Sequence, residues 1–564
     1  MPLPEQRCKL LDVMVRYFSC ITKHVVVEHL QSFRLGSATA DILLSETRKA
    51  TQDLQQNNFI CFFRAGPNVM KAVKKELKEL HPNLIDVGEC CLHKVNIEFS
   101  HGINAFDSEV KAAVVDVYYF FKIAVQSASI KAQQEVLQLP SNVFLRHLSS
   151  RWLTLGPAVD RLIEQFPAIR SVMSDSACRV GRELRQSLRK AFSDRSFYAK
   201  LVFMKNAAHI FTDFLSLFQK SDPLAHLLYS EMVALVFRLC GRFMTKESYS
   251  SKKGTELPLL QAESPANWKA KVEIAEDTEQ EISSWEAADK RAFRLGARTF
   301  YIKCTEYLVS RLPFGNLLLK SLRFLKPESR EKESSCSDLR QLASGLKQVI
   351  EPRDISALMD EYNLLRLQHI ESDAFISVEK HWQTIFDEMK PDNGGKYPLL
   401  SNIVKALLWI LHGNAGVERG FSVNRRQLNE RSRLTIQTVN GITNIVSYAK
   451  RFGSDPSSFD VTSDVVRAVR GASKRYRERL AAEEEQAAKR QRANVPKMTP
   501  SDADKTLKLE VETAKKMLVN AELVINNGIK TKNFGDIESG QALLAEGKTR
   551  LSAAVDKMSP KAAN

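Results

Sequence analysis

The sequence predicts an α+β protein with a small sheet near its N-terminus, a long helical middle and a basic helical tail. Three observations indicate this order. β-Branched apolar runs alternate with helical spacing in the first hundred residues, apolar residues then recur at i, i+3, i+4 and i+7, and the last part is rich in Lys and Arg. With 564 residues, the chain is long enough for roughly three to four domains.

The predicted sheet is built from four apolar runs. Residues 10–20 and 24–35 are rich in β-branched and aromatic side chains and predict an antiparallel strand pair. Residues 38–58 change to helical spacing, 58–63 suit a short buried strand, and 66–82 predict a helix that ends before Pro82. Residues 83–93 predict another strand, so the order is strand, strand, helix, strand, helix, strand.

The middle of the chain, from Ile103 to Ile370, is predicted to be almost entirely helical. Two polar stretches, 245–267 and 326–338, predict loops. Two or three more helices follow Tyr397. The first carries Leu400, Ile403, Leu407 and Leu411 on one face, and the last, at 434–452, carries Ile436, Val439, Ile442 and Val446.

The tail changes character twice. Between Arg467 and Lys497 there are ten Lys and Arg against four Glu in a helix-permissive stretch. Its two clusters are equally compatible with a nuclear localisation signal and with a solvated helix face; they are Lys474 with Arg475, and Lys489, Arg490 and Arg492. Beyond them, apolar residues at spacings of three, four and seven predict a two-helix hairpin or short coiled coil, linked by residues 526–536.

Charge and cysteine content limit the partners and the cellular compartment that are expected for the protein. The formal net charge of +16 favours a polyanionic partner such as DNA or RNA, although ordinary solubility explains it equally well. Nine scattered cysteines without paired CxxC spacing favour a reducing compartment. With no signal-peptide pattern and no apolar run of about 18 residues, we expect a nuclear location and no membrane partner.

Several motifs occur in an order that resembles the hAT transposase family. NAGVERGFS at 414–422 is followed by a basic loop with Arg425 and Arg426 and then by Arg433-Leu434, which is similar to the family's C-terminal dimerisation region. His381-Trp382 and Tyr397-Pro398 match its lead-in. Upstream, Gly66-Pro67-Asn68, the Cys90 and His93 pair, and Arg151-Trp152 match further family motifs, so the resemblance covers residues 8 to 452.

The resemblance implies an RNase H-like core with an incomplete sheet, interrupted by a helical insertion. The implied division is 1–100 for the first part of the core, 101–370 for the insertion, 371–453 for the second part of the core with the dimerisation region, 454–500 for a basic linker helix, and 501–564 for the hairpin. The family's chemistry needs three carboxylates to hold two divalent metal ions.

By the resemblance, Glu418 matches the third carboxylate, but Ala65 stands where the family has the second. A methyl group cannot bind Mg²⁺, and the strand that carries the first carboxylate has no counterpart upstream of residue 10. The resemblance therefore implies a catalytically inactive protein without metal or cofactor. It is expected to self-associate and to bind nucleic acid, DNA being possible, largely through electrostatics, because no paired Cys and His motif occurs in residues 1–60.

The residues expected to carry these functions fall in two sets. Those expected in the dimerisation surface or core are Ile403, Leu407, Leu411, Phe421, Ile442 and Val446. Those expected to contact nucleic acid are Arg151, Trp152, Arg425, Arg426, Lys474, Arg475, Lys489, Arg490 and Arg492.

Some of these residues also have a purely structural interpretation. Trp152 either packs in the core or stacks on a base, and Cys90 with His93 either packs as a buried cysteine beside a histidine or forms half of a zinc site. Packing is the favoured interpretation at both places. Two other functions are weighed against an inactive binding protein. One is an active metal-dependent transposase or nuclease with relocated carboxylates, drawn from Asp12, Asp86 and Glu89, and the other is a purely structural interaction module.

Overall fold

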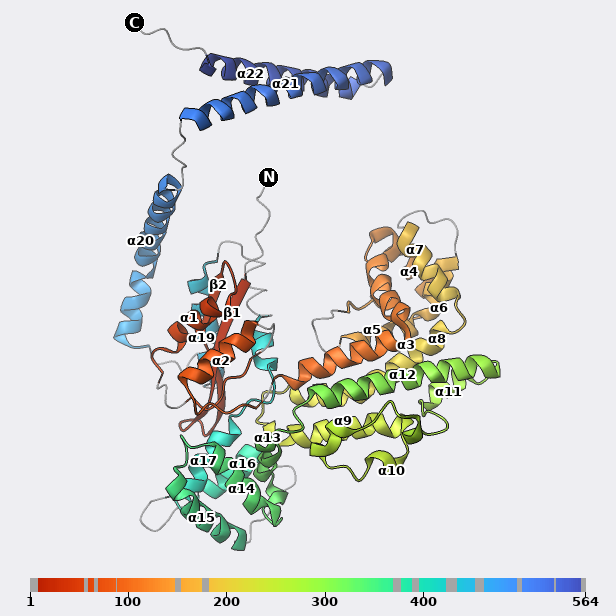
Figure 1. Cartoon of the computed structure of the whole chain (residues 1–564). Coiled ribbons are helices and arrows are strands. Elements are labelled where there is room, and N and C mark those ends of the chain that lie inside the picture. Colours follow the sequence, from red (N-terminus) through yellow and green to blue (C-terminus); the bar gives the residue numbers. More distant parts are fainter. Residues whose placement is uncertain are drawn as a thin grey trace. The chain divides into compact units, whose positions relative to one another are not determined.

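The computed structural model describes residues 9–54, 59–64, 69–87, 89–147, 154–174, 182–368, 377–387, 395–421, 434–451, 461–493, 500–531 and 534–558. The chain forms two compact units, Met1–Pro456 and Ser457–Asn564. Figure 1 shows both, with the sheet and most helices in the first unit and three long helices in the second. It is an α+β protein in which helices predominate.

The predicted antiparallel strand pair is present. β1 (Lys9–Ser19) pairs with β2 (His24–Leu35), with a register shift between Val13 and Met14. The tight turn between the strands places Lys23 at a φ of 55°. Among the residues that the structure describes, β1 has no ladder partner other than β2.

The strands predicted at 58–63 and 83–93 form no ladder among the described residues and share one isolated β-bridge. Cys61 and Ile85 form a single parallel bridge, and the Ile85 N–H donates to the Ile60 carbonyl at 2.8 Å. The second half of the strand predicted at 83–93 was wrong, because helix α3 begins at Cys91. Cys91, Val95 and Phe99 are all buried at helical spacing, so the longer helical repeat outweighs the short apolar run.

Helices α1 (Ala40–Thr51) and α2 (Val69–Leu80) cover this small sheet. They share one apolar cluster with β2 and with the residues that precede Ile85, and its buried members are Leu35, Leu43, Val73, Leu77 and Leu84. Burial of this cluster fixes the segment 59–63 beside the strands although it forms no ladder.

The helical middle follows the prediction in outline. Its helices are α3 (Cys91–Phe121), α4 (Ala124–Val136), α5 (Leu155–Glu164), α6 (Phe166–Ser174), α7 (Arg182–Ser193), α8 (Phe197–Phe218), α9 (Ala225–Phe243), α10 (Lys246–Tyr249), α11 (Glu276–Ile282), α12 (Ala287–Arg311), α13 (Leu317–Ser321), α14 (Ser334–Gly345) and α15 (Ile355–Leu367). The predicted loops were partly wrong. Residues 245–267 contain α10 and two 3₁₀ helices, and α14 starts inside 326–338.

After this helical middle the chain returns to the sheet. α16 (Val378–Phe386) contacts the β1–β2 turn, where Glu379 accepts from the Val25 N–H at 2.7 Å and Asp387 pairs with Lys23 at 2.8 Å. α17 (Pro398–Leu408) packs on β1, and α19 (Ile436–Arg451) packs on β2. Segments more than 350 residues apart therefore build one layer around β1 and β2.

The residues expected in the dimerisation surface or core differ in exposure. Ile403 and Leu407 of α17 are fully buried, whereas Leu411 is half-buried and Phe421 is exposed. On α19 the expected apolar face is only partly covered. Val439 is buried, but Ile442 is half-buried and Val446 is 45% exposed, because α19 meets β2 mainly through asparagine side chains.

The second unit consists of α20 (Ser463–Ala493), α21 (Pro500–Thr531) and α22 (Phe534–Met558). α21 and α22 form the predicted hairpin, with Ala514, Ala521 and Ala554 buried along the seam. The predicted link at 526–536 was too long, since α21 continues to Thr531 and α22 resumes at Phe534.

Within the described ranges, no single helix is both long and apolar enough to span a membrane, although the bent pair α3 and α4 passes the test when taken together.

Candidate functional site

Glu418 and Arg419, the adjacent pair in NAGVERGFS, lie on the short helix 415–421 and contact different parts of the protein. The Arg419 guanidinium donates to the Gln219 carbonyl at 2.6 Å and to Ser221 Oγ at 2.7 Å. Glu418 is half-buried and lies near Cys90, where its negative charge adds to the effect of burial in raising the pKa of the Cys90 thiol. Burial raises the pKa of the Glu418 carboxyl to about 7.

The turn after α8 is held by three basic side chains, which we call the turn-binding cluster: Arg16, His412 and Arg419. Arg16 of β1 donates to the Ser221 carbonyl at 3.2 Å, and His412 Nε2 lies 3.1 Å from the Phe218 carbonyl oxygen. Three segments thus converge on the carbonyls of one turn, so Arg419 has a structural role between the C-terminal segment and the helical middle.

Burial shapes the charge state of this cluster. Arg16 is only 7% exposed, and burial lowers its pKa to about 10, so it remains charged at neutral pH. Burial lowers the pKa of His412 to about 4, so this imidazole is neutral and donates its Nε2 proton to the turn.

Arg64, at the end of the segment 59–64, forms an ion pair with the partly exposed Glu89. The Arg64 side chain is buried and its guanidinium bonds Glu89, which also lies 3.6 Å from Lys94 and 3.9 Å from Lys71. Burial opposes ionisation of Glu89, but these three cations outweigh it and lower its pKa. Arg64 immediately precedes Ala65 in the sequence, and Ala65 itself lies outside the described residues.

The acids considered for a relocated metal site are occupied in other ways. Asp86 pairs with Lys74 at 2.5 Å, and Glu89 is bound to Arg64. Asp12 accepts from Ser32 Oγ at 2.5 Å, although a Cβ at Gly420 would lie 4.0 Å from Asp12 Oδ2, so the Glu418 helix does approach β1 there. In the portion of the chain that the structure describes, no three His, Cys, Asp or Glu side chains are grouped as a metal site.

A polar network attaches α19 to β2. Asn440 clamps Ser32, accepting from its N–H at 2.8 Å and donating to its carbonyl at 3.1 Å. His29 lies 2.8 Å from both Ser32 Oγ and Asn444 Oδ1. None of these residues was expected from the sequence, and the signal that could have revealed them is the i, i+4 spacing of Asn440 and Asn444, which places both amides on one side of the helix.

The predicted nucleic-acid residues are only partly described. Lys474 and Arg475 are exposed on α20, and Lys489, Arg490 and Arg492 belong to the same helix, which is described there without their side chains. Arg151, Trp152, Arg425 and Arg426 lie outside the described residues. Of the possible zinc pair, Cys90 is buried and His93 is exposed, so the two side chains do not share an environment.

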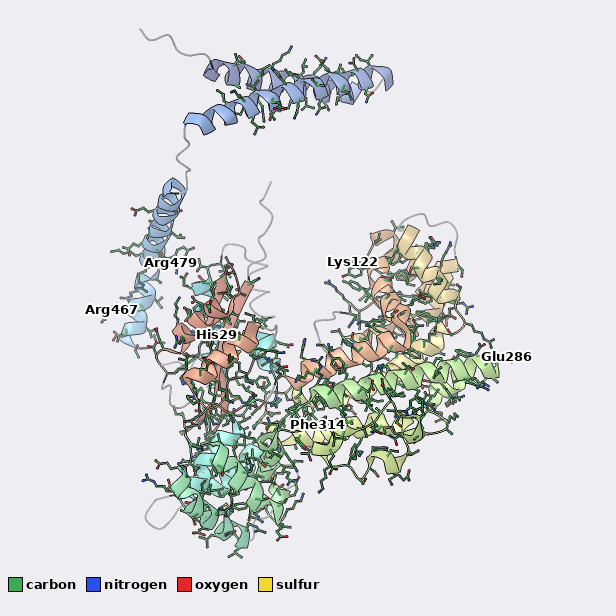
Figure 2. All side chains as sticks on the ribbon, viewed as in Figure 1. His29, Lys122, Glu286, Phe314, Arg467 and Arg479 are labelled. Atoms are coloured by element: carbon green, nitrogen blue, oxygen red, sulfur yellow. The ribbon has the colours of Figure 1, made fainter. Side chains whose placement is uncertain are left out.

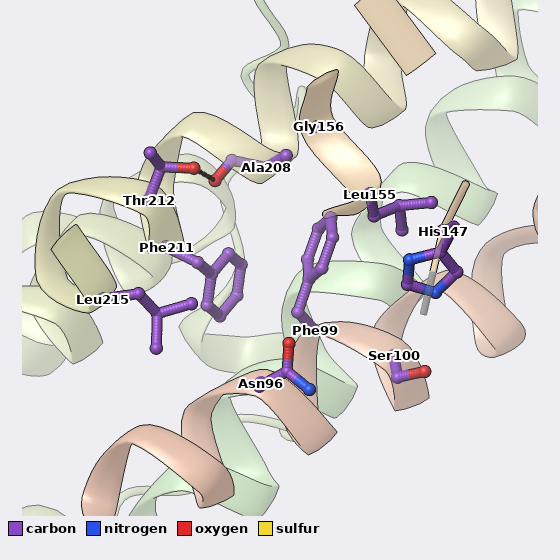
Figure 3. A pocket seen from close by; sticks show the side chains of 10 residues that line it. All are labelled: Asn96, Phe99, Ser100, His147, Leu155, Gly156, Ala208, Phe211, Thr212 and Leu215. Atoms are coloured by element: carbon purple, nitrogen blue, oxygen red, sulfur yellow. Dashed lines mark hydrogen bonds between the residues drawn. The ribbon is translucent and has the colours of Figure 1, made fainter. Parts of the chain in front are cut away.

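The best-formed cavity lies in the helical middle. Figure 3 shows it between α3, α5 and α8, with Phe99 and Phe211 facing each other and His147 at one side. Its volume is about 30 Å³, which is room for a water molecule but not for a substrate.

No protein-family model matches the chain, and no curated protein sequence matches it.

Proposed function

We propose that this chain is a catalytically inactive, hAT-transposase-derived protein that self-associates and binds nucleic acid largely through electrostatics in the nucleus. The observation that carries the loss of catalysis is the Arg64–Glu89 ion pair. The buried Arg64 of this pair immediately precedes Ala65, which the resemblance aligns with a metal ligand, and a cation next to that residue in the sequence disfavours Mg²⁺ binding.

The surface of α19 supports self-association. Its outer face carries Ile445 at 71% exposure, Val446 at 45% and Tyr448 at 43%, next to the half-buried Ile442. A continuous apolar face on an otherwise anchored helix is typical of a protein interface. A second copy of this chain fits as its occupant, because the resemblance places the family's dimerisation region here.

Charge supports nucleic-acid binding. The chain carries +16 overall, and α20 exposes a run of Arg and Lys with few acidic neighbours. Such binding is expected to weaken steeply with salt, because each neutralised phosphate releases counterions.

The test combines two measurements on one sample of the whole chain: binding to arbitrary duplex DNA at two salt concentrations, and light scattering. We expect salt-sensitive binding by a dimer or larger species. A monomer that binds no DNA would overturn the proposal and favour a purely structural role. Ile445→Ser with Val446→Ser should reduce self-association, and the control Gln437→Ser, at an exposed position of the same helix, should not.

The absence of catalysis has its own test. With Mg²⁺ or Mn²⁺ the protein should not nick DNA. Strand transfer that disappears in Glu418→Gln would instead establish the active-enzyme alternative, with Asp12 the nearest candidate for a second ligand.

A further inference from the structure

α20 is a long helix whose described side chains are almost all exposed. Between Val461 and Ala482 nearly every side chain is exposed, the half-buried ones being Val465, Gly471, Arg479 and Leu480. Its 31 residues correspond to a rod of about 46 Å. Figure 2 shows its side chains projecting from the helix, with Arg467 and Arg479 labelled.

Four cations lie on one face of this rod, which we call the basic stripe: Arg467, Arg470, Lys474 and Arg477. Their spacing of i, i+3, i+7 and i+10 keeps them within one quarter of the helix circumference over about 15 Å. Their polar contacts are weak: Arg467 and Lys474 form exposed ion pairs, and Arg477 Nε donates to the Ser473 carbonyl at 3.4 Å. Arg467 lies 3.2 Å from Asp464 and Lys474 lies 3.9 Å from Glu478, with all four side chains strongly exposed.

The remaining arginines of this region are turned back onto the helix. Arg475 donates to the Ala468 carbonyl and lies over Gly471, where the missing side chain leaves room for it. Arg479 stacks on Tyr476 at 5.3 Å. Lys474 and Arg475 are adjacent in sequence but differ in side-chain position, because Lys474 belongs to the basic stripe whereas Arg475 bonds the backbone of its own helix.

We propose that α20 binds duplex DNA by laying the basic stripe into the major groove, with its cations on the flanking phosphates. This inference rests on the nucleic-acid binding proposed above and names its surface and the class of nucleic acid. An α-helix fits the major groove of B-form DNA but not the deep, narrow one of A-form RNA. The charge of the stripe is complementary to phosphate, and the open surface of the described part of α20 leaves room for a duplex.

The experiment neutralises the basic stripe with Arg467→Gln, Arg470→Gln, Lys474→Gln and Arg477→Gln in the whole chain. The matched control carries Lys508→Gln, Lys515→Gln, Lys516→Gln and Lys548→Gln on the exposed surface of the α21–α22 hairpin, which removes the same net charge. Gln is a good helix former, so circular dichroism should show both variants as helical as the parent. Each is titrated with duplex DNA, duplex RNA of the same sequence, and single-stranded DNA at several salt concentrations.

We expect the parent and the control to prefer duplex DNA. Loss of the basic stripe should weaken duplex DNA binding about 100-fold near physiological salt. The slope of the logarithm of the binding constant against the logarithm of the salt concentration should become shallower by about three to four. Equal loss in the control, or equal parental affinity for duplex RNA, would overturn groove binding by α20 while leaving electrostatic nucleic-acid binding in place. A parent that binds none of the three would overturn the proposed function itself.

Discussion

Glu418 and Arg419 are neighbours in sequence, yet the fold gives them separate tasks. Arg419 reaches the turn after α8, where it satisfies a backbone carbonyl, whereas Glu418 stays half-buried near Cys90. Burial disfavours the charged form of the Glu418 carboxyl, which raises its pKa. Arg419 holds helix 415–421 against the turn after α8.

Glu418→Gln tests this account through pH. The folded-state pKa of about 7 lies above the ordinary value of 4.5. The stabilisation associated with the protonated carboxyl is therefore present below pH 4.5 and is lost as the pH rises through 7. The variant should be more stable than the parent at pH 8, by roughly 1 to 3 kcal/mol, and equal to it at pH 4. Urea unfolding at both pH values measures this, and an equal difference at the two would contradict it.

Arg64 and Glu89 provide a second residue-scale prediction. Arg64→Met should lower the free energy of unfolding by roughly 1 to 2 kcal/mol, because the partly exposed Glu89 loses its buried partner, and Arg64→Met with Glu89→Leu should recover part of that loss. A double-mutant cycle by urea unfolding gives the coupling. Additive effects of the two substitutions would show that Glu89 depends on Lys94 and Lys71 instead.

At the scale of elements, α19 is attached to β2 by polar contacts while its apolar side faces outward. Asn440→Ala removes both hydrogen bonds to the Ser32 backbone and leaves a strand N–H without this partner. We expect a loss of roughly 1 to 3 kcal/mol, together with faster hydrogen exchange in α19. Gln437→Ala, at an exposed position of the same helix, is the control, and matching exchange rates in the two variants would contradict the clamp.

The α21–α22 hairpin depends on close approach of its two backbones. A Cβ at Gly540 would lie 2.5 Å from Ile525 Cγ1 and 3.2 Å from the Ala521 carbonyl oxygen, so Gly540→Ala should loosen the seam despite the higher helix propensity of Ala. At Gly471 of α20 the nearest atom is the mobile end of Arg475, so Gly471→Ala should add about 1 kcal/mol of helix stability. Hydrogen exchange of α21 and α20 separates these opposite outcomes.

At the scale of the whole molecule, long-range contacts unite the first unit. Arg16, His412 and Arg419 come from opposite ends of that unit and meet at a turn in its middle. The small sheet is completed in the same way, since α16, α17 and α19 return to it after the helical middle. The stability of the sheet therefore depends on residues more than 350 positions away.

Buried histidines predict how this unit responds to acid. Burial lowers the pKa values of His147, His226 and His412 to about 4, below their ordinary 6.5. As the pH falls, these histidines become protonated in the unfolded chain before they do so in the folded one. The stability that the neutral histidines contribute is therefore present above pH 6.5 and is lost as the pH falls toward 4. Glu418 and Glu98, whose pKa values burial raises to about 7 and 9, oppose this decline.

Stability should therefore decline below pH 6.5, and His226→Gln should reduce the decline by roughly 1 to 3 kcal/mol between pH 7 and 4. His209→Gln, at an exposed position of α8, should leave it unchanged. Unfolding by urea at four pH values measures the slopes, and parallel slopes for the parent and His226→Gln would contradict the argument.

Much of the local structure could be predicted from the sequence. The strands at 9–19 and 24–35, the helices of the middle and the C-terminal hairpin all follow from periodicity, because one face of each element is buried. The prediction failed where a short run had two readings, as at residues 83–93, and the polar attachment of α19 to β2 was not foreseen because asparagine side chains make it. The candidate site was the least predictable part, because Arg16 and His412 stand in no motif.

The sequence by itself determined the β1–β2 strand pair, most of the helices, the charge and the presence of Glu418, Arg419 and Ala65 in a family-like order. These are properties of composition and spacing along one chain. Only the tertiary structure decided that Arg64 pairs with Glu89, that Arg419 binds the turn after α8, and that Lys474 projects while Arg475 folds back. Side-chain partners depend on which distant segments are packed together, and burial rather than sequence position sets the pKa of Glu418.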